Sequence, residues 1–553
     1  MPSSIHNIAQ LLNQQANEQP RSNAVFFPES RDAFGRVAYT HLTFKQLHER
    51  SDSFAWGMQA LGVCPGQKAL LMIRPSLDFY SLLFAIFKIG AVPVLIDPGM
   101  GWKNFLSCVR SMEPEVFLGI PSAHLLRLLT RRFFRSVKIN ITLGKYRFWG
   151  GRTIAELQGG EKPFPIHEME PDDLAAVLFT SGSTGPAKGV SYTHRIFNTQ
   201  VRLVQREYGI KPGEMDLACF PLFSLFSIAL GASVVIPDMD PSKPASVNPE
   251  RILEPIRNLP VTYSFGSPTL WDQVSRYACE KKIRLPGLRR VIMAGAPVPA
   301  QVHERLLHLL LDSGAETYTP YGATESLPIA NFRGSEMLAE TQEATSAGKG
   351  TCVGKPIPEI QTKIITISDL PIAIMQDAQE LPLGETGELC VSGPCVTKEY
   401  YRKPEATRLA KIQDGAKVWH RVGDVGYFDR QGRFWFCGRK AHRVEIHTEA
   451  GKQQTLFSIP CEAIFNKLPG VKRSALVGIG KRPTQIPAII IETEQNHCLS
   501  DSDILKTAAC NPLTTPIRHV FFHPSFPVDV RHNAKINREE LARWAAKKLK
   551  YPQ

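Results

Sequence analysis

Between Leu42 and about Gly393, short apolar runs alternate with segments whose apolar residues recur at helical spacing. The run 175–180 (AAVLFT) is of the first kind, and a loop rich in Gly, Ser and Thr follows it. The next apolar positions recur every three or four residues, at Phe197, Val201, Val204 and Tyr208. This spacing predicts a strand, a loop and a helix in that order.

The same alternation continues along the chain. A buried strand is expected at 290–294 (RVIMA), and Pro299 is expected to open a helix that ends at Gly314. The apolar run 79–96 is interrupted by a lysine, a glycine and a proline, so it predicts a buried helix and a buried strand rather than a membrane span. Strands that alternate with helices predict an α/β fold with helix-covered sheets.

The pattern changes near Val418. The stretch VGYFDRQGRFWFCG is typical of two strands joined by a turn at 429–432. The residues beyond Gly438 have strands and helices of their own, and the last helix is expected to begin after Asn537, with Glu540 at its third position. A separate C-terminal unit is therefore expected.

Length and composition agree with that division. The chain has 553 residues, of which 43% are hydrophobic and 21% are charged, so it is globular and too long for one ordinary domain. We expect a hinge near 438–443 between a large domain, 1–438, and a small domain, 439–553.

The charge balance narrows the class of partner. The net charge is +13 and the isoelectric point is about 9.2, which favours anionic partners such as nucleotides. The sequence has no zinc-finger spacing, aromatic RNA-binding signature or basic heptads, so nucleic-acid binding is not expected.

Cysteine usage and the N-terminal stretch indicate the cellular compartment of the protein. The 11 cysteines include no CxxC pair, and the first residues lack the features of a secretory signal, so a cytoplasmic protein with reduced thiols is expected. The segment 125–138 (LLRLLTRRFFRSVK) is both basic and apolar. It fits a helix packed on the core with its arginines outside, and it also fits contact with a membrane surface. Among partners of the whole protein, a biosynthetic complex stays open as well.

The strongest chemical signal is the loop 180–189 (TSGSTGPAKG). Glycines let backbone N–H groups approach an anion, hydroxyl groups add hydrogen-bond donors, and Lys188 adds a positive charge. The loop is expected between a strand and a helix, where phosphates bind well. It is not a Walker A loop, because that motif needs GxxxxGK[ST]. A flexible Ser/Gly turn is the alternative, and the concentration of these residue types argues against it.

This loop resembles the signature of the adenylate-forming superfamily, which includes acyl-CoA synthetases, peptide-synthetase adenylation domains and firefly-type luciferases. Other segments match that family in the expected order, namely AGAP (294–297), YGATE (321–325), GELCVSGP (387–394), Gly423-Asp424, Gly438-Arg439 and Lys535. Taken alone, Lys535 is best interpreted as a solvated lysine and Asp424 as a turn residue. Together and in this order, the segments favour membership of the adenylate-forming superfamily. The resemblance implies a large domain of mixed sheets with a barrel-like subdomain, and a small, mobile α+β domain.

The resemblance also implies roles for individual residues. Those expected at the nucleotide are Thr180, Ser181, Gly182, Ser183, Thr184, Gly185, Gly295, Ala296, Pro297, Tyr321, Gly322, Asp424 and Arg439. Catalytic roles are expected for Lys188, Thr324, Glu325 and Lys535, and Mg²⁺ is expected at Glu325 and Thr184. ATP and Mg²⁺ are thus the implied cofactors, and a carboxylate would attack the α-phosphate while pyrophosphate leaves.

Departures from the family pattern point to one branch. Ala441, Glu445, Val422 and Ala534 replace residues typical of acyl-CoA synthetases, which puts the use of coenzyme A in doubt. The segments 94–101 (VLIDPGMG) and 531–535 (RHNAK) resemble those of β-lactone synthetases of long-chain olefin biosynthesis. That branch adenylates a 2-alkyl-3-hydroxy fatty acid, whose own hydroxyl group then displaces AMP and closes a four-membered lactone.

The acyl site is expected at 220–231 (FPLFSLFSIALG) and 264–268 (SFGSP), which the family uses for this purpose. Phenylalanines and the absence of an acidic residue from 220–231 favour an aliphatic acid over an amino acid, although ordinary core explains most of these residues equally well. Three alternatives stay open, namely a ligase that passes a fatty acyl group to coenzyme A or a carrier protein, a nucleotide-binding protein without turnover, and an oxygenase of the luciferase type.

Overall fold

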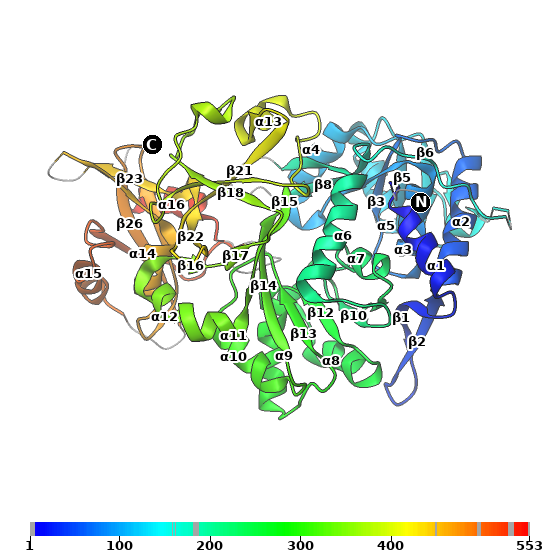
Figure 1. Cartoon of the computed structure of the whole chain (residues 1–553), viewed down its shortest axis with the longest axis horizontal. Coiled ribbons are helices and arrows are strands. Elements are labelled where there is room, and N and C mark those ends of the chain that lie inside the picture. Colours follow the sequence, from blue (N-terminus) through cyan, green and yellow to red (C-terminus); the bar gives the residue numbers. More distant parts are fainter. Residues whose placement is uncertain are drawn as a thin grey trace.

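The computed structural model describes residues 6–157, 159–160, 162–180, 187–447, 451–494, 499–528 and 536–550 (Figure 1). Two large sheets and the helices around them form five layers in the N-terminal part. One apolar core joins α8, α9 and α10 to a nine-stranded sheet, a second joins the two sheets through α1, α2, α3, α6 and α7, and a third joins a seven-stranded sheet to α4.

The nine-stranded sheet is parallel in its centre and antiparallel at both edges. Its order is β17 (Lys355–Pro356), β15 (Ser326–Arg333), β14 (Glu316–Ala323), β13 (Arg290–Met293), β12 (Tyr263–Gly266), β10 (Met215–Ala218), β11 (Ser233–Val235), β1 (Asn23–Arg31) and β2 (Val37–Thr43). The central strands are short apolar runs that helices cover on both faces, as parallel sheets require.

The seven-stranded sheet is parallel except for its last pair. Its order is β7 (Arg152–Thr153), β6 (Ile139–Thr142), β5 (Val116–Gly119), β3 (Lys68–Met72), β4 (Val92–Leu95), β8 (Leu174–Thr180) and β9 (Lys188–Thr193). Along β3, Ala69 and Leu71 face the core between the two sheets, whereas Leu70 faces the outer core. This period of two explains why every position of the strand after Lys68 is apolar.

The helices of the N-terminal part are α1 (Ala9–Glu18), α2 (Phe44–Ala60), α3 (Leu77–Ile89), α4 (Trp102–Met112), α5 (Pro121–Leu129), α6 (His194–Tyr208), α7 (Ser224–Ala229), α8 (Pro249–Asn258), α9 (Pro268–Glu280), α10 (Ala300–Leu309), α11 (Gly334–Glu336), α12 (Gln342–Ala344) and α13 (Pro404–Ala410). Helix α3 lies in the middle layer and is buried from Phe79 onward, which explains its apolar character all round. The Ser76 hydroxyl caps its N-terminus, and Gly90, with φ of 78°, ends it.

An antiparallel six-stranded sheet occupies the place of the expected barrel-like subdomain. It contains β16 (Thr351–Cys352), β22 (Phe434–Arg439), β21 (Lys417–Phe428), β19 (Gly387–Ser392) and β18 (Gln361–Ile365), with β20 (Lys411–Asp414) beside β21. The predicted turn between β21 and β22 is confirmed, because the Gly432 N–H donates to the Asp429 carbonyl.

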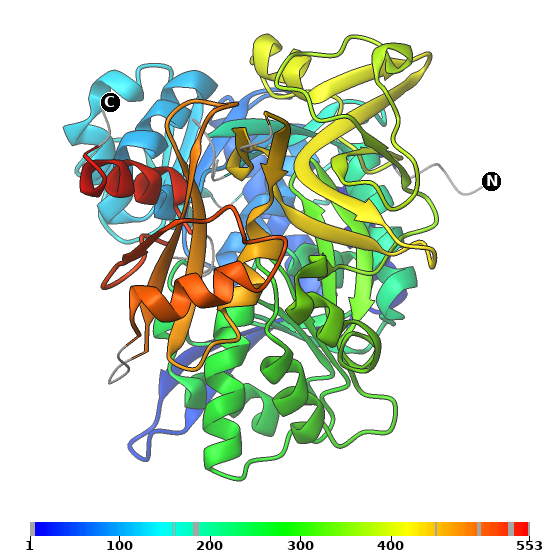
Figure 2. The ribbon, with the colours of Figure 1, turned by 90° about the vertical axis from the view of Figure 1, so that its left-hand side faces the viewer.

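The C-terminal part lies at one end of the molecule and faces the viewer in Figure 2. Its elements are β23 (Val444–His447), β24 (Gln453–Leu456), α14 (Ser458–Phe465), β25 (Val471–Ile479), β26 (Ile486–Thr493), α15 (Asp501–Ala509), β27 (His519–Phe522) and α16 (Arg538–Lys548). The predicted start of α16 is confirmed, since the Asn537 side chain accepts from the Glu540 N–H. A large N-terminal and a small C-terminal domain are present, and their boundary at 438/439 stays a prediction.

Two local predictions are wrong. The helix after Pro299 ends at Leu309 rather than at Gly314, because Leu310 leaves the helix to bridge Leu285. The loop after β8 does not lead directly into a helix. It leads into β9, which pairs antiparallel with β8, and α6 begins only at His194. The N-terminus of α6 is therefore separated from the phosphate loop by a whole strand.

Ten of the 11 cysteines lie in the part of the chain that the structure describes, and none of these ten forms a disulfide. Cys64 and Cys510 are exposed and Cys279 is half-buried, whereas the remaining seven are buried. Burial raises the pKa of the Cys219 thiol to about 12. Among the described residues, no helix is both long enough and apolar enough to cross a bilayer.

Candidate active site

A cavity of about 1990 Å³ lies along the carboxyl ends of the parallel strands of both large sheets. Its walls come from the segments that follow β3, β4, β5, β10, β12, β13 and β14. Open α/β sheets bind ligands at this edge. The volume exceeds the roughly 300–1,000 Å³ of pockets for drug-sized ligands, so it accommodates a nucleotide together with a second large molecule.

The cavity brings together ten of the residues that the sequence predicted. They are Lys188, Gly295, Ala296, Pro297, Tyr321, Gly322, Thr324, Glu325, Asp424 and Arg439. The backbone of Thr180 pairs with Lys188 at the end of β8. Ser181, Gly182, Ser183, Thr184, Gly185 and Lys535 lie outside the described residues, so their expected roles stay predictions.

Asp424 is the centre of a polar cluster on one wall. The Tyr321 hydroxyl donates to its Oδ2 at 2.5 Å, and Arg439 Nη1 lies 2.5 Å from its Oδ1. Burial and the negative charge of Asp424 raise the pKa of Tyr321 well above its usual value, so this hydroxyl stays protonated. The contacts hold the aromatic ring and the carboxylate in fixed positions, as a site for a base and a ribose requires.

Glu325 is the centre of a second cluster. The residue is 8% exposed, and its carboxylate accepts from the Tyr400 hydroxyl at 2.6 Å. The ring of Tyr400 lies 4.9 Å from Lys188 Nζ, within the range of a cation–π contact. The Tyr192 hydroxyl donates to the Thr324 carbonyl at 2.6 Å, which fixes the neighbouring residue as well.

Strand β9 explains how Lys188 reaches this cluster. Lys188 and Tyr192 are an even number of positions apart along the strand, so both side chains lie on the same face, and both line the cavity. Tyr400 is held beside them because the Tyr401 N–H donates to the Gly189 carbonyl at 2.8 Å. Sequence reasoning missed Tyr400, because no local motif signals a contact that depends on strand pairing.

The side chains near Glu325 suit Mg²⁺ only when a substrate supplies further ligands. Within the described ranges, no group of three or more His, Cys, Asp or Glu side chains could hold a metal ion. A single buried carboxylate at the cavity wall fits a Mg²⁺ ion that phosphate oxygens and water also coordinate.

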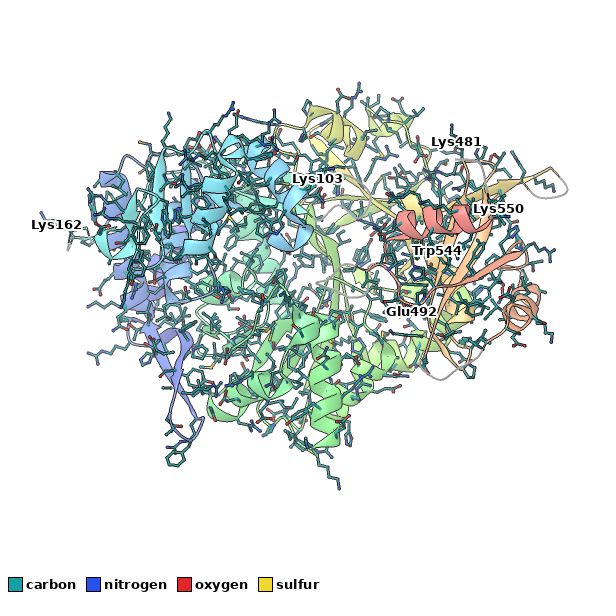
Figure 3. The ribbon with its side chains drawn as sticks, turned by 180° about the vertical axis from the view of Figure 1, so that it is seen from behind. Lys103, Lys162, Lys481, Glu492, Trp544 and Lys550 are labelled. Carbon is teal, nitrogen blue, oxygen red and sulfur yellow. The ribbon has the colours of Figure 1, made fainter. Side chains whose placement is uncertain are left out.

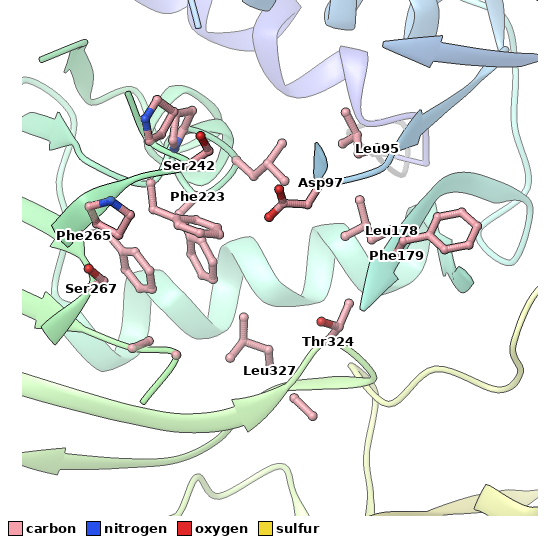
Figure 4. Close-up of a pocket in the computed structure, with 18 of the residues that line it drawn as sticks. Leu95, Asp97, Leu178, Phe179, Phe223, Ser242, Phe265, Ser267, Thr324 and Leu327 are labelled. Atoms are coloured by element: carbon pink, nitrogen blue, oxygen red, sulfur yellow. The ribbon is translucent and has the colours of Figure 1, made fainter. Parts of the chain in front are cut away.

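The region beside these clusters is apolar. Phe223 and Phe265 stack with ring centroids 3.8 Å apart, and Leu95, Leu178 and Leu327 surround the same space (Figure 4). As expected, Phe220–Phe223 and Phe265 line the cavity, whereas Ile228 belongs to the core. The space fits an aliphatic chain.

One carboxylate enters this apolar space. Asp97 follows β4, and Figure 4 shows its side chain turned toward the gap between Phe223, Leu178 and Thr324. Its Oδ1 accepts the Gly99 N–H at 2.7 Å, which orients the side chain. Sequence reasoning included Asp97 in a branch-specific segment but gave it no role, because its direction depends on how β4 joins the sheet.

Glu388 holds the start of the predicted hinge to the six-stranded sheet. Its fully buried carboxylate lies 2.6 Å from Arg421 Nη2 and 2.8 Å from Lys440 Nζ. Lys440 directly follows Arg439, so two neighbouring cations of the hinge each have a carboxylate partner on this sheet.

Replacing Glu388 with alanine is expected to lower the free energy of unfolding by about 3–5 kcal/mol, because two cations lose their buried partner. Glu359→Ala is the matched control, since Glu359 also pairs with two cations, Arg202 and Arg206, but at the surface. It is expected to cost about 1 kcal/mol or less. Chemical unfolding followed by fluorescence measures both, and equal losses would contradict the assignment.

These clusters, around one cavity at the edge of two α/β sheets, are the features of an adenylate-forming enzyme. The family model of AMP-binding enzymes matches residues 12–401, and the chain belongs to that family.

Two relatives that match nearly the whole chain have a narrower name. An olefin β-lactone synthetase from Stenotrophomonas maltophilia is 44% identical over 557 residues, which cover 98% of this chain and 98% of that protein. A second, from Xanthomonas campestris, is 43% identical over 553 residues, covering 98% and 97%. Among solved structures, an amide bond synthetase from Marinactinospora thermotolerans has the same fold, with a TM-score of 0.78, 21% identity and coverage of 97% of this chain and 99% of that one.

Proposed function

We propose that the protein activates a long-chain 2-alkyl-3-hydroxy fatty acid with ATP and closes the acyl-AMP to a β-lactone. The observation that carries the proposal is an identity of 44% and 43%, over 98% of the chain, to two enzymes named olefin β-lactone synthetases. The apolar space beside Thr324 and Glu325 supports it, since a long aliphatic acid fits there.

In the first step, a carboxylate oxygen attacks the α-phosphate and the bond to pyrophosphate breaks. Tyr321 and Asp424 bind the adenosine, Lys188 neutralises phosphate charge, and Lys535 stabilises the charge that develops at the reacting phosphate. Mg²⁺ bound at Glu325, together with Thr184, would supply further neutralisation of the phosphate oxygens. The work of the protein is positioning and charge stabilisation.

In the second step, the 3-hydroxyl oxygen attacks the acyl carbon, a C–O bond forms, and the bond from that carbon to the AMP oxygen breaks. The hydroxyl proton needs an acceptor. Asp97 is suited to this role because its carboxylate enters the apolar space where the acyl chain would lie (Figure 4). The step needs no thiol, in agreement with the departures at Ala441 and Glu445.

Product analysis tests the proposal. The purified protein, ATP and Mg²⁺ are mixed with a 2-alkyl-3-hydroxy fatty acid, with and without coenzyme A, and the products are identified by mass spectrometry and NMR. A β-lactone and AMP are expected in both mixtures. An acyl-CoA that forms only when coenzyme A is present, with no β-lactone, would contradict the proposal and indicate an ordinary acyl-CoA ligase.

A further inference from the structure

The surface around α5 exposes an unusual number of large apolar side chains. Trp102, Leu125, Leu129, Tyr146 and Phe148 are 57%, 55%, 77%, 64% and 88% exposed. We call these five residues the α5 surface. Helix α5 buries Ala123 and His124, and Leu126 packs against the outer core, as expected, whereas Leu125 and Leu129 face outward.

Contacts between elements hold this surface together. Arg127 Nη2 donates to the Trp149 carbonyl at 3.0 Å, and the rings of His124 and Trp149 stack with centroids 5.1 Å apart. These contacts fix the loop that carries Tyr146 and Phe148 against α5. The ring centroids of Tyr146 and Phe148 lie 5.7 Å apart in a stacked arrangement, so these two exposed rings form one apolar group.

The charge around the α5 surface has a single sign. Residues 116–155 contain no Asp or Glu, and their eight basic residues are Arg127, Arg131, Arg132, Arg135, Lys138, Lys145, Arg147 and Arg152. Arg147 and Arg152 pair with Glu156. Arg131, Arg132 and Arg135 are exposed and form no ion pair with any described residue. The expectation that these arginines lie outside is confirmed.

The α5 surface also borders an opening of the large cavity. Trp102, Leu125 and Leu129 are exposed, and the same three residues line the large cavity. The cavity therefore opens between apolar side chains that basic residues surround. Lys103, next to Trp102, is labelled on the face of the molecule seen in Figure 3.

Apolar side chains, aromatic rings and unpaired arginines together match the chemistry of a lipid surface. Leucines and aromatic rings enter the headgroup region, while cations bind anionic headgroups. Neither apolar insertion nor charge attraction alone anchors a protein stably to a bilayer, but the two together do. A protein partner of standard interface chemistry would not explain why the large cavity opens at three of the five residues.

We propose that the α5 surface docks on a bilayer that contains anionic lipids, and that the acid enters the cavity from that bilayer. Direct entry spares a long-chain acid the cost of crossing water with its chains exposed. The docking stands on the surface alone, whereas the entry of the acid rests on the proposed function.

Co-sedimentation tests the docking. The full-length protein, without ATP or acid, is mixed with large vesicles of phosphatidylcholine alone or of phosphatidylcholine with phosphatidylglycerol. We expect binding to the mixed vesicles that weakens as salt rises. Each basic residue near an anionic bilayer strengthens binding by about fivefold, so Arg131→Gln/Arg132→Gln/Arg135→Gln is expected to lose on the order of a hundredfold.

Matched variants separate the patch from general effects. Arg21→Gln/Arg430→Gln/Arg543→Gln removes the same charge from other exposed sites and is expected to bind nearly as the unchanged protein does. For the apolar residues, Leu129→Ser/Phe148→Ser is expected to weaken binding by about tenfold or more. Its control, Leu370→Ser/Phe34→Ser, changes side chains that are 73% and 85% exposed. Circular dichroism confirms that each variant is folded.

The outcomes decide the proposal. The docking is overturned if the unchanged protein does not bind the mixed vesicles. It is also overturned if the variants and their controls bind the vesicles equally well. Either result would leave an acidic protein as the occupant of the α5 surface. Pyrophosphate release from an acid held in vesicles is expected to fall in the triple arginine variant, while release from a cyclodextrin-solubilised acid stays unchanged. Vesicle binding without any turnover would remove the proposed function and leave the docking intact.

Discussion

Replacing Asp97 with asparagine is expected to leave pyrophosphate release nearly unchanged and to slow lactone formation by roughly 10²–10⁴-fold. The asparagine side chain has nearly the same shape and can still accept the Gly99 N–H, so the loop after β4 keeps its conformation. It cannot accept the hydroxyl proton. Acyl-AMP is therefore expected to accumulate, and quenched reactions analysed by mass spectrometry would show it.

Asp240→Asn is the matched control for this variant. Asp240 also lines the cavity, and its Oδ1 accepts the N–H of the residue two positions on, as Asp97 does. It comes from a different loop, so its replacement is expected to leave both steps intact. Normal lactone formation by the Asp97→Asn protein would rule out Asp97 as the proton acceptor.

Replacing Lys535 with alanine is expected to slow acyl-AMP formation by roughly 10²–10³-fold while ATP binding changes little, because its charge is needed at the reacting phosphate. Lys535 lies outside the described residues. Ile536 and Arg538, which follow it, line the cavity, so the chain reaches the site at this point.

Two measurements separate binding from chemistry in this variant. Calorimetric titration with a non-hydrolysable ATP analogue measures binding, and pyrophosphate release measures adenylation. Lys547→Ala, which changes an exposed lysine of α16, serves as the control. Unchanged adenylation by the Lys535→Ala protein would falsify the role given to this lysine.

Much of the fold could be predicted from the sequence because its signals are local. The helical spacing from Phe197 to Tyr208, the turn before Gly432 and the cap at Asn537 each depend on neighbouring residues, and the structure has all three. Strand β9 was missed because its apolar and polar residues directly follow a glycine-rich loop, and only pairing with β8 makes them a strand.

The candidate active site shows the same difference between local signals and contacts that depend on distant segments. Tyr321, Glu325 and Asp424 belong to motifs that the sequence displays. Tyr400 does not, and Glu388 lies in the segment 387–394 without a role that the sequence indicates. Their importance comes from partners far along the chain, at Glu325 for Tyr400 and at Arg421 and Lys440 for Glu388. Contacts of this kind arise only when separate strands meet.

The cysteines provide a means to observe motion between the two domains. Of the ten that the structure describes, Cys64 and Cys510 are the exposed pair, and they lie on opposite sides of the predicted hinge. With Cys498 and the half-buried Cys279 replaced by serine, maleimide dyes would attach to one natural thiol in each domain. Energy transfer between the two dyes would then report any change in the distance between the domains when ATP, and afterwards the acid, is added.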